Sequence, residues 1–129
     1  ATLSAIAVPG YSAYIDKARM TKVIAEIRML EKEIFLFQVE NDRFPDTLGE
    51  IGVDHIRDPW GKPYQYANHA TTPKGERRKY KGTVPITDDF DLYSMGKDGK
   101  TGIPITSKYG RDDIVRADNG GYVGPAQDF

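Results

Sequence analysis

The chain has 129 residues, 39% hydrophobic and 29% charged, which suits one folded domain and excludes a disordered or multidomain chain. Its net charge of -1 provides no overall attraction to nucleic acid, so we expect no nucleic-acid partner. The absence of cysteine excludes disulfides and thiolate metal sites, and two histidines far apart in sequence are a poor supply for histidine-based catalysis.

The chain begins inside an apolar run that extends from Leu3 to Val8. This run is much shorter than the roughly 20 residues that a membrane-spanning helix needs, and no basic residue precedes it as in a signal peptide. We interpret residues 1–8 as the end of a truncated hydrophobic segment. Pro9 and Gly10 then form either a joint to the following segment or the first turn of its helix.

A long amphipathic helix is predicted over residues 9–40. Apolar residues recur at spacings of three and four and form one stripe, namely Met20, Val23, Ile27, Leu30, Ile34 and Phe37. Charged residues occupy the other faces, and pairs such as Arg28 and Glu31 lie one turn apart. A stripe of this length predicts that the helix packs on a sheet.

Residues 41–63 are predicted to connect this helix to a set of strands over residues 64–95. Pro45 ends the helical region, and Asp46 and Thr47 can cap a short helical turn that Gly52 stops. Alternation predicts strands in YQY at 64–66 and in DFDLYSM at 89–95. The fold class is therefore α+β, as a single domain over residues 1–129 in which the helix lies on a small antiparallel sheet.

Residues 96–129 are rich in Gly, Asp, Pro and Asn and are predicted to form an irregular C-terminal loop. Asp98 lies in a glycine-rich turn, and Asp112 and Asp113 follow side by side. Calcium binds carboxylate and carbonyl oxygens, so these residues are candidate ligands. Ordinary solvated turns are the alternative, and the spacing is not that of an EF-hand.

Other candidate sites are weaker. Five basic residues surround Tyr80, namely Lys74, Arg77, Arg78, Lys79 and Lys81, and are interpreted as a solvated loop or a surface for an acidic partner. His55 and His69 accompany no ligand or nucleophile motif, and Trp60 is expected to pack over the helix. No nucleophile-elbow, P-loop or dinucleotide motif is present, so we predict that the chain is not an enzyme. Paired carboxylates for glycoside hydrolysis remain open, because their spacing is set by the fold.

Three segments together resemble the major pseudopilins of type II secretion systems, within the type IV pilin-like family. They are AIAVPGYSAYIDKAR leading into the long helix, DPWGKPYQY, and DFDLYSMGKDGK, the last two being the more specific. The resemblance covers nearly the whole chain. It implies an apolar N-terminal helix that spans the inner membrane before assembly and packs the fibre core afterwards, with leader cleavage and methylation at sites outside this chain.

The resemblance further implies calcium as cofactor, with Met95 (through its backbone carbonyl), Asp98, Asp112 and Asp113 as ligands. The segment between Asp98 and Asp112 is longer than in the family, so the loop must fold back. The implied function is a fibre subunit, anchored in the bacterial inner membrane with a periplasmic domain, that associates with itself, minor pseudopilins and inner-membrane secretion proteins. A type IV pilus subunit and a secreted calcium-dependent binding module are the alternatives.

Overall fold

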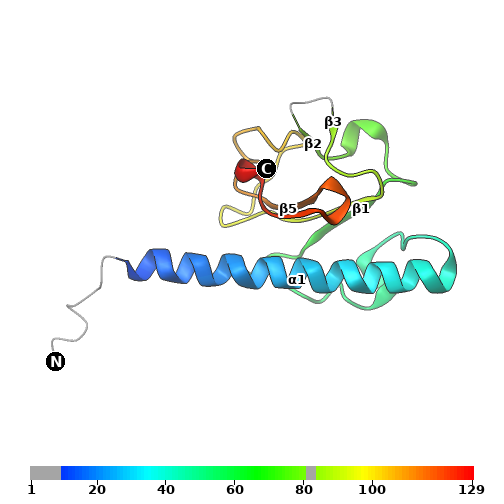
Figure 1. Cartoon of the computed structure of the whole chain (residues 1–129), viewed down its shortest axis with the longest axis horizontal. Coiled ribbons are helices and arrows are strands. Elements are labelled where there is room, and N and C mark those ends of the chain that lie inside the picture. The colour runs from blue at the N-terminus through cyan, green and yellow to red at the C-terminus, as the bar shows by residue number, and fades with distance from the viewer. Residues whose placement is uncertain (1–9, 81–83) are drawn as a thin grey trace.

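The structure is a computed structural model that describes residues 10–80 and 84–129. The predicted remnant at 1–8, together with Pro9, lies outside the described residues. One long helix, α1 (Tyr11–Asn41), packs along one face of a four-stranded antiparallel sheet (Figure 1). The predicted helix on a small antiparallel sheet is confirmed. None of the helices in the described part of the chain is long and apolar enough to cross a membrane.

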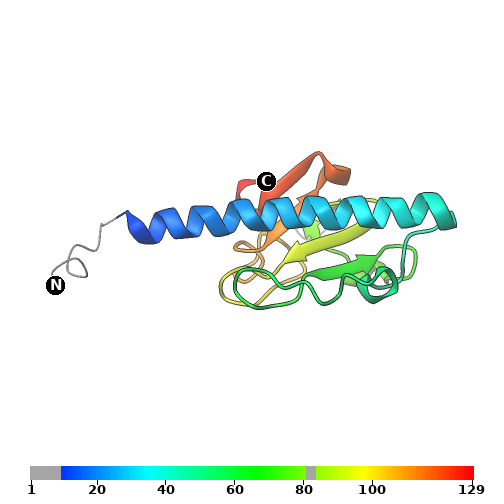
Figure 2. The same ribbon diagram turned by 90° about the horizontal axis from the view of Figure 1, so that it is seen from below.

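The apolar stripe of α1 forms the main core. Val23, Ile27, Leu30 and Ile34 have no exposed surface, whereas Met20 and Phe37 at the ends of the stripe are partly buried. Complete burial of each such side chain stabilises the fold by on the order of 2 kcal/mol. The first turns of α1 extend past the sheet, where Tyr11 and Tyr14 are 64% and 70% exposed (Figures 1 and 2).

The connection after α1 follows its predicted local signals. Asp42 ends the helix in the left-handed conformation, with φ of 56°. A short 3-10 helix, η2 (Leu48–Ile51), starts at Thr47, whose hydroxyl accepts the backbone N–H of Glu50 at 3.3 Å. It ends at Gly52, whose φ of 74° suits a residue without a side chain.

The four-stranded sheet has the order β1-β4-β5-β6. Its strands are β1 (Gln65–Asn68), β4 (Phe90–Ser94), β5 (Ile114–Ala117) and β6 (Tyr122–Pro125). Tyr66 pairs with Leu92. Phe90 and Leu92 join the core under α1, whereas Tyr93 and Met95 join a second core on the opposite face.

Residues 96–129 differ from the irregular loop that we expected, because β5 and β6 both lie within them. β5 is completely buried. The sequence pattern did not indicate a strand here, because the charged Arg116 interrupts its apolar residues. Its guanidinium lies on the helix side, where Nη1 donates to Asp89 Oδ1 at 2.7 Å and Nε donates to Glu31 on α1. This ion cluster joins the helix to the sheet.

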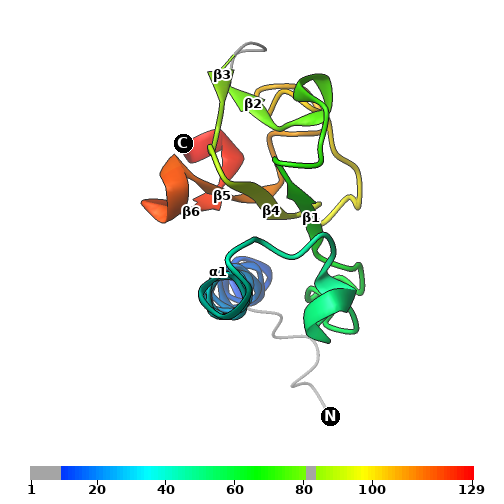
Figure 3. The same cartoon turned by 90° about the vertical axis from the view of Figure 1, so that its right-hand side faces the viewer.

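The face of the sheet opposite α1 is covered by a second, smaller layer (Figure 3). It contains a two-stranded hairpin, β2 (Lys79–Tyr80) with β3 (Val84–Pro85), beside the segment around Ile105. Three further 3-10 helices, η3 (Lys74–Glu76), η4 (Asp118–Gly120) and η5 (Ala126–Asp128), complete the fold. The sheet is therefore buried on both faces, which the sequence pattern did not predict.

Candidate functional site

A hydrogen-bond chain links the DPWG bend to the turn that follows β4. The buried Asp58 accepts the backbone N–H of Trp60 at 3.1 Å and that of Lys62 at 2.9 Å through Oδ1. Its Oδ2 accepts the Ser94 hydroxyl at 2.8 Å, and Ser94 Oγ accepts the backbone N–H of Gly96 at 3.1 Å. Asp58 therefore fixes the bend and the turn relative to each other.

The same turn is held tightly against the predicted acidic pair. Gly96 has φ of 71°, and a Cβ at this position would lie 2.3 Å from the backbone oxygen of Asp112. Only glycine fits both the backbone conformation and this close approach. The long segment between Asp98 and Asp112 does fold back, which brings Asp112 against the turn that holds Asp98.

Two of the three aspartates in this loop are shielded from water, since Asp112 is partly buried and Asp113 is buried. Burial, followed by the adjoining Asp98 carboxyl, raises the pKa of Asp112 to about 6. Burial also raises the pKa of Asp113 to about 7, although the Thr101 hydroxyl donates a hydrogen bond to it. Oδ1 of Asp112 and Oδ1 of Asp113 are both buried without a hydrogen-bond partner. Carboxylate oxygens without a hydrogen-bond partner are ligands of the kind that a hard cation binds.

A calcium site at this loop stays a prediction, because its carboxylates alone do not form a metal site. Within residues 10–80 and 84–129, no group of three or more His, Cys, Asp or Glu residues is arranged to hold a metal ion. A cation here would depend on Asp98 and Asp112, on Asp113 beside them and on backbone carbonyls, a mixture that calcium accepts. The Met95 side chain packs against the second core, and its backbone carbonyl stays a predicted ligand.

Sequence reasoning missed three residues that shape this loop, namely Asp58, Ser94 and Thr101. Asp58 was visible as the first residue of a proline-containing turn, a position where a carboxylate caps backbone N–H groups. Ser94 and Thr101 had no comparable signal, because their roles depend on contacts with Asp58 and Asp113 across the fold.

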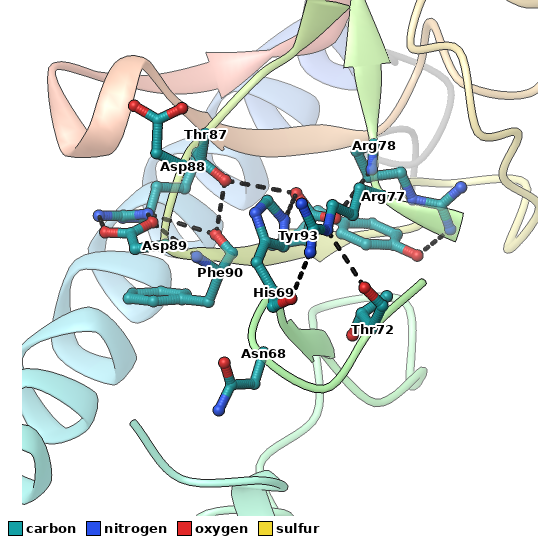
Figure 4. Close-up of polar contacts among 12 residues, drawn as sticks. Asn68, His69, Thr72, Arg77, Arg78, Thr87, Asp88, Asp89, Phe90 and Tyr93 are labelled. Atoms are coloured by element: carbon teal, nitrogen blue, oxygen red, sulfur yellow. Dashed lines mark hydrogen bonds and ion pairs between the residues drawn. The ribbon is translucent and has the colours of Figure 1, made fainter. Parts of the chain in front are cut away.

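Much of the basic segment around Tyr80 is used inside the molecule. Figure 4 shows Arg77 reaching the backbone carbonyls of His69 and Thr72, and Arg78 donating to the Tyr93 hydroxyl. The Arg78 guanidinium also lies 4.4 Å from the centroid of the Tyr93 ring. These two arginines hold the hairpin layer on the sheet. Lys81 lies outside the described residues.

His69 lies beneath the same layer and is only 4% exposed. Its Nε2 is 3.2 Å from Oδ1 of Asp91, and the same carboxylate accepts the backbone N–H of Arg78 at 2.8 Å through Oδ2. Both ring nitrogens of His69 are buried without a hydrogen-bond partner among the described residues, and no catalytic motif accompanies this histidine in the sequence.

Comparison with known proteins adds an independent finding. No family model matches the sequence. The type II secretion system core protein G of Aeromonas hydrophila is 25% identical over 123 residues, which cover 78% of this chain and 74% of the relative. The protein of the same name from Pseudomonas aeruginosa is 27% identical over 123 residues, covering 78% and 75%, and that from Pectobacterium carotovorum is 24% identical, covering 78% and 68%.

These relatives are core proteins of a secretion system rather than enzymes, in agreement with the prediction that the chain is not an enzyme. The similarity extends over most of each sequence, and the fold contains the long helix and the sheet that the sequence pattern predicted. The chain is a distant homologue of type II secretion system core protein G, the major pseudopilin.

Proposed function

We propose that this chain is a structural fibre subunit, a major pseudopilin that polymerises in the periplasm to support type II protein secretion. The homology to core protein G over 78% of the chain is the observation that carries this proposal. The fold supports it, because the first turns of α1 extend past the sheet and present exposed aromatic side chains that a neighbouring subunit can cover.

In this proposal an apolar N-terminal helix anchors the subunit in the inner membrane before assembly. Minor pseudopilins and inner-membrane proteins of the secretion machinery are the expected partners. Deletion of the gene in its native host tests the function. We expect the normally secreted proteins to accumulate in the periplasm, and complementation to restore their export. Intact secretion with loss of surface pili would contradict the proposal and assign the chain to a pilus.

We also propose that calcium orders the C-terminal loop. Asp98, Asp112 and Asp113, with the Met95 carbonyl, are the residues that would hold it. The bound ion would supply positive charge beside the Asp112 and Asp113 oxygens that have no hydrogen-bond partner. Thr101 and the Asp58–Ser94 chain keep these carboxylates in place.

Thermal unfolding tests the calcium site. A ligand that binds only the folded state, at a concentration of 100 times its Kd, stabilises that state by about 2.7 kcal/mol. We expect calcium to raise the unfolding midpoint of the chelator-treated protein. Asp98→Ala and Asp112→Ala should abolish the rise, whereas Asp128→Ala, an exposed control, should keep it. An equal rise in all four proteins would exclude the site.

A further inference from the structure

An acidic groove lies at the C-terminal end of α1, against η2. It is a hollow of about 280 Å³ lined by Glu33, Leu36, Phe37, Glu40, Glu50 and Ile51. Glu50 forms an ion pair with Arg43, whereas the described residues provide no ion-pair partner for Glu33 or Glu40. Leu36, one of the apolar residues that line the groove, is 48% exposed. The groove suits a cationic group carried beside an apolar or aromatic side chain.

The loop between β4 and β5 carries Asp98, Asp112 and Asp113, and it also has an exposed basic side that we call the basic loop. It presents four exposed cations, namely Lys97, Lys100, Lys108 and Arg111, and none of them has an ion-pair partner among the described residues. The ammonium groups of Lys100 and Lys108 lie 5.1 Å and 5.5 Å from the centroid of the Tyr109 ring. Tyr109 itself is 41% exposed, an amphipathic ring of the kind that anchors protein interfaces.

The acidic groove and the basic loop lie toward opposite ends of the globular part. The last turns of α1 and η2 form one end, and the segment between β4 and β5 lies toward the end from which the first turns of α1 extend (Figures 1 and 2). The basic loop of one molecule therefore cannot reach the acidic groove of the same molecule. Two different patches on one subunit form a head-to-tail contact, which stays open for a further copy at each end.

We propose that the acidic groove receives the basic loop of a second copy of this chain, with Tyr109 over Leu36 and the lysines beside Glu33 and Glu40. This inference rests on the proposed fibre role, to which it adds the residues of one contact between subunits. Opposite charge steers the two copies into register, and the repulsion between like patches disfavours groove-to-groove and loop-to-loop pairing.

Cysteine cross-linking tests the contact, because the chain contains no cysteine of its own. Val39→Cys beside the groove and Thr106→Cys on the loop change exposed positions and leave all the proposed charges intact. The two proteins are mixed at high concentration in low salt and oxidised. We expect severalfold more mixed dimer than either homodimer, and severalfold more than from Thr106→Cys mixed with the control Lys22→Cys on the exposed side of α1.

Charge reversal makes the test specific. Lys100→Glu with Lys108→Glu, added to the loop protein, should reduce the mixed dimer to the level of the control pair. Glu33→Lys with Glu40→Lys, added to the groove protein, should then restore it. Circular dichroism and the unfolding midpoint establish that each variant is folded. Mixed dimer at the control level for the unreversed pair, or insensitivity to the reversals, would overturn the proposal.

The secretion experiment gives a separate readout. If export stays intact after gene deletion, the proposed role in secretion is wrong, whereas the contact shown by cross-linking remains supported. If cross-linking fails but gene deletion blocks export, only this contact between subunits is wrong.

Discussion

Asp58 connects two segments that are far apart in the sequence. Its carboxylate accepts the backbone N–H groups of Trp60 and Lys62 and the hydroxyl of Ser94 at the end of β4, and only 3% of the residue is exposed. Because Asp58 and Ser94 are buried, loss of the carboxylate leaves the Ser94 hydroxyl and the two backbone N–H groups without this partner.

We therefore predict that Asp58→Ala lowers the free energy of unfolding by about 2–3 kcal/mol, since removal of one buried partner costs the desolvation of the others. Urea denaturation measures the change. The matched control is Asp54→Ala, an exposed carboxylate four residues earlier, which should change the stability by less than about 0.5 kcal/mol. Equal losses in the two variants would contradict the structural role of Asp58.

Arg116 is the second residue that holds distant parts together. Its completely buried guanidinium binds Asp89 and Glu31 and lies 4.1 Å from the centroid of the Phe90 ring. The aspartate and the glutamate keep 20% and 15% exposure, so water can solvate part of their charge if the arginine is removed.

Arg116→Met should lower the free energy of unfolding by about 3 kcal/mol, the lower end of the range for breaking a buried ion pair from one side. Arg28→Met removes an exposed arginine that also approaches Glu31, and should cost about 1 kcal/mol or less. Chemical denaturation of both variants checks the difference. A smaller loss in Arg116→Met than in Arg28→Met would rule out the cluster as the main link between α1 and the sheet.

The sequence predicts three acidic residues of the loop as metal ligands, but it gives no signal for Ser94 and Thr101, which contact buried carboxylates. Asp98, Asp112 and Asp113 could be predicted as a group because carboxylates beside glycines are visible as a pattern. Ser94 and Thr101 act through contacts with residues that lie 36 and 12 positions away, and no local pattern encodes such contacts. The role of Gly96 likewise depends on the approach of Asp112 from another part of the chain.

At the scale of elements, the local periodicity of apolar residues was sufficient to predict α1, β1 and β4. It was not sufficient to predict β5 and β6. β5 is four residues long and contains a buried arginine, so neither its length nor its polarity indicates a strand. β6 includes Gly124 and Pro125, which have low strand propensity. Both strands form through pairing with neighbours, such as Val115 with Tyr93 and with Gly124.

β4 carries a buried carboxylate that makes stability depend on pH. Asp91 is 1% exposed, and burial raises its pKa above the ordinary value in spite of the Arg78 backbone N–H and the nearby His69. A raised pKa means that the folded state binds the proton more tightly than the unfolded state. The contribution of Asp91 to stability is therefore greatest below about pH 4, the ordinary pKa of aspartate, and is lost as pH rises through the folded-state pKa.

We predict that Asp91→Asn becomes more stable relative to the unmodified chain as pH rises from 4 to 7, because the amide carries no charge to desolvate. Urea midpoints of both proteins, measured in chelator across this range, give the difference. The exposed control Asp128→Asn should follow the unmodified chain. A difference that is constant with pH would show that the Asp91 carboxyl titrates alike in the folded and unfolded states.

At the scale of the whole molecule, the asymmetry of the fold is the property that matters for assembly. The sheet and its hairpin layer cover only part of α1, and the remaining turns extend as a stalk (Figure 1). The acidic groove and the basic loop lie toward opposite ends of the globular part. A subunit with these features can contact copies along its helix and at its two ends, which is the requirement for a polymer rather than a closed dimer.

The central claim is that this chain is the repeating subunit of a fibre. The most direct measurement is immunogold electron microscopy of fibres sheared from native-host cells that overproduce the protein, with an antibody raised against this chain. The account predicts labelling along the entire length of the fibres, and none in the gene-deletion strain. Fibres without label, in cells that export the chain as a free protein, would contradict it.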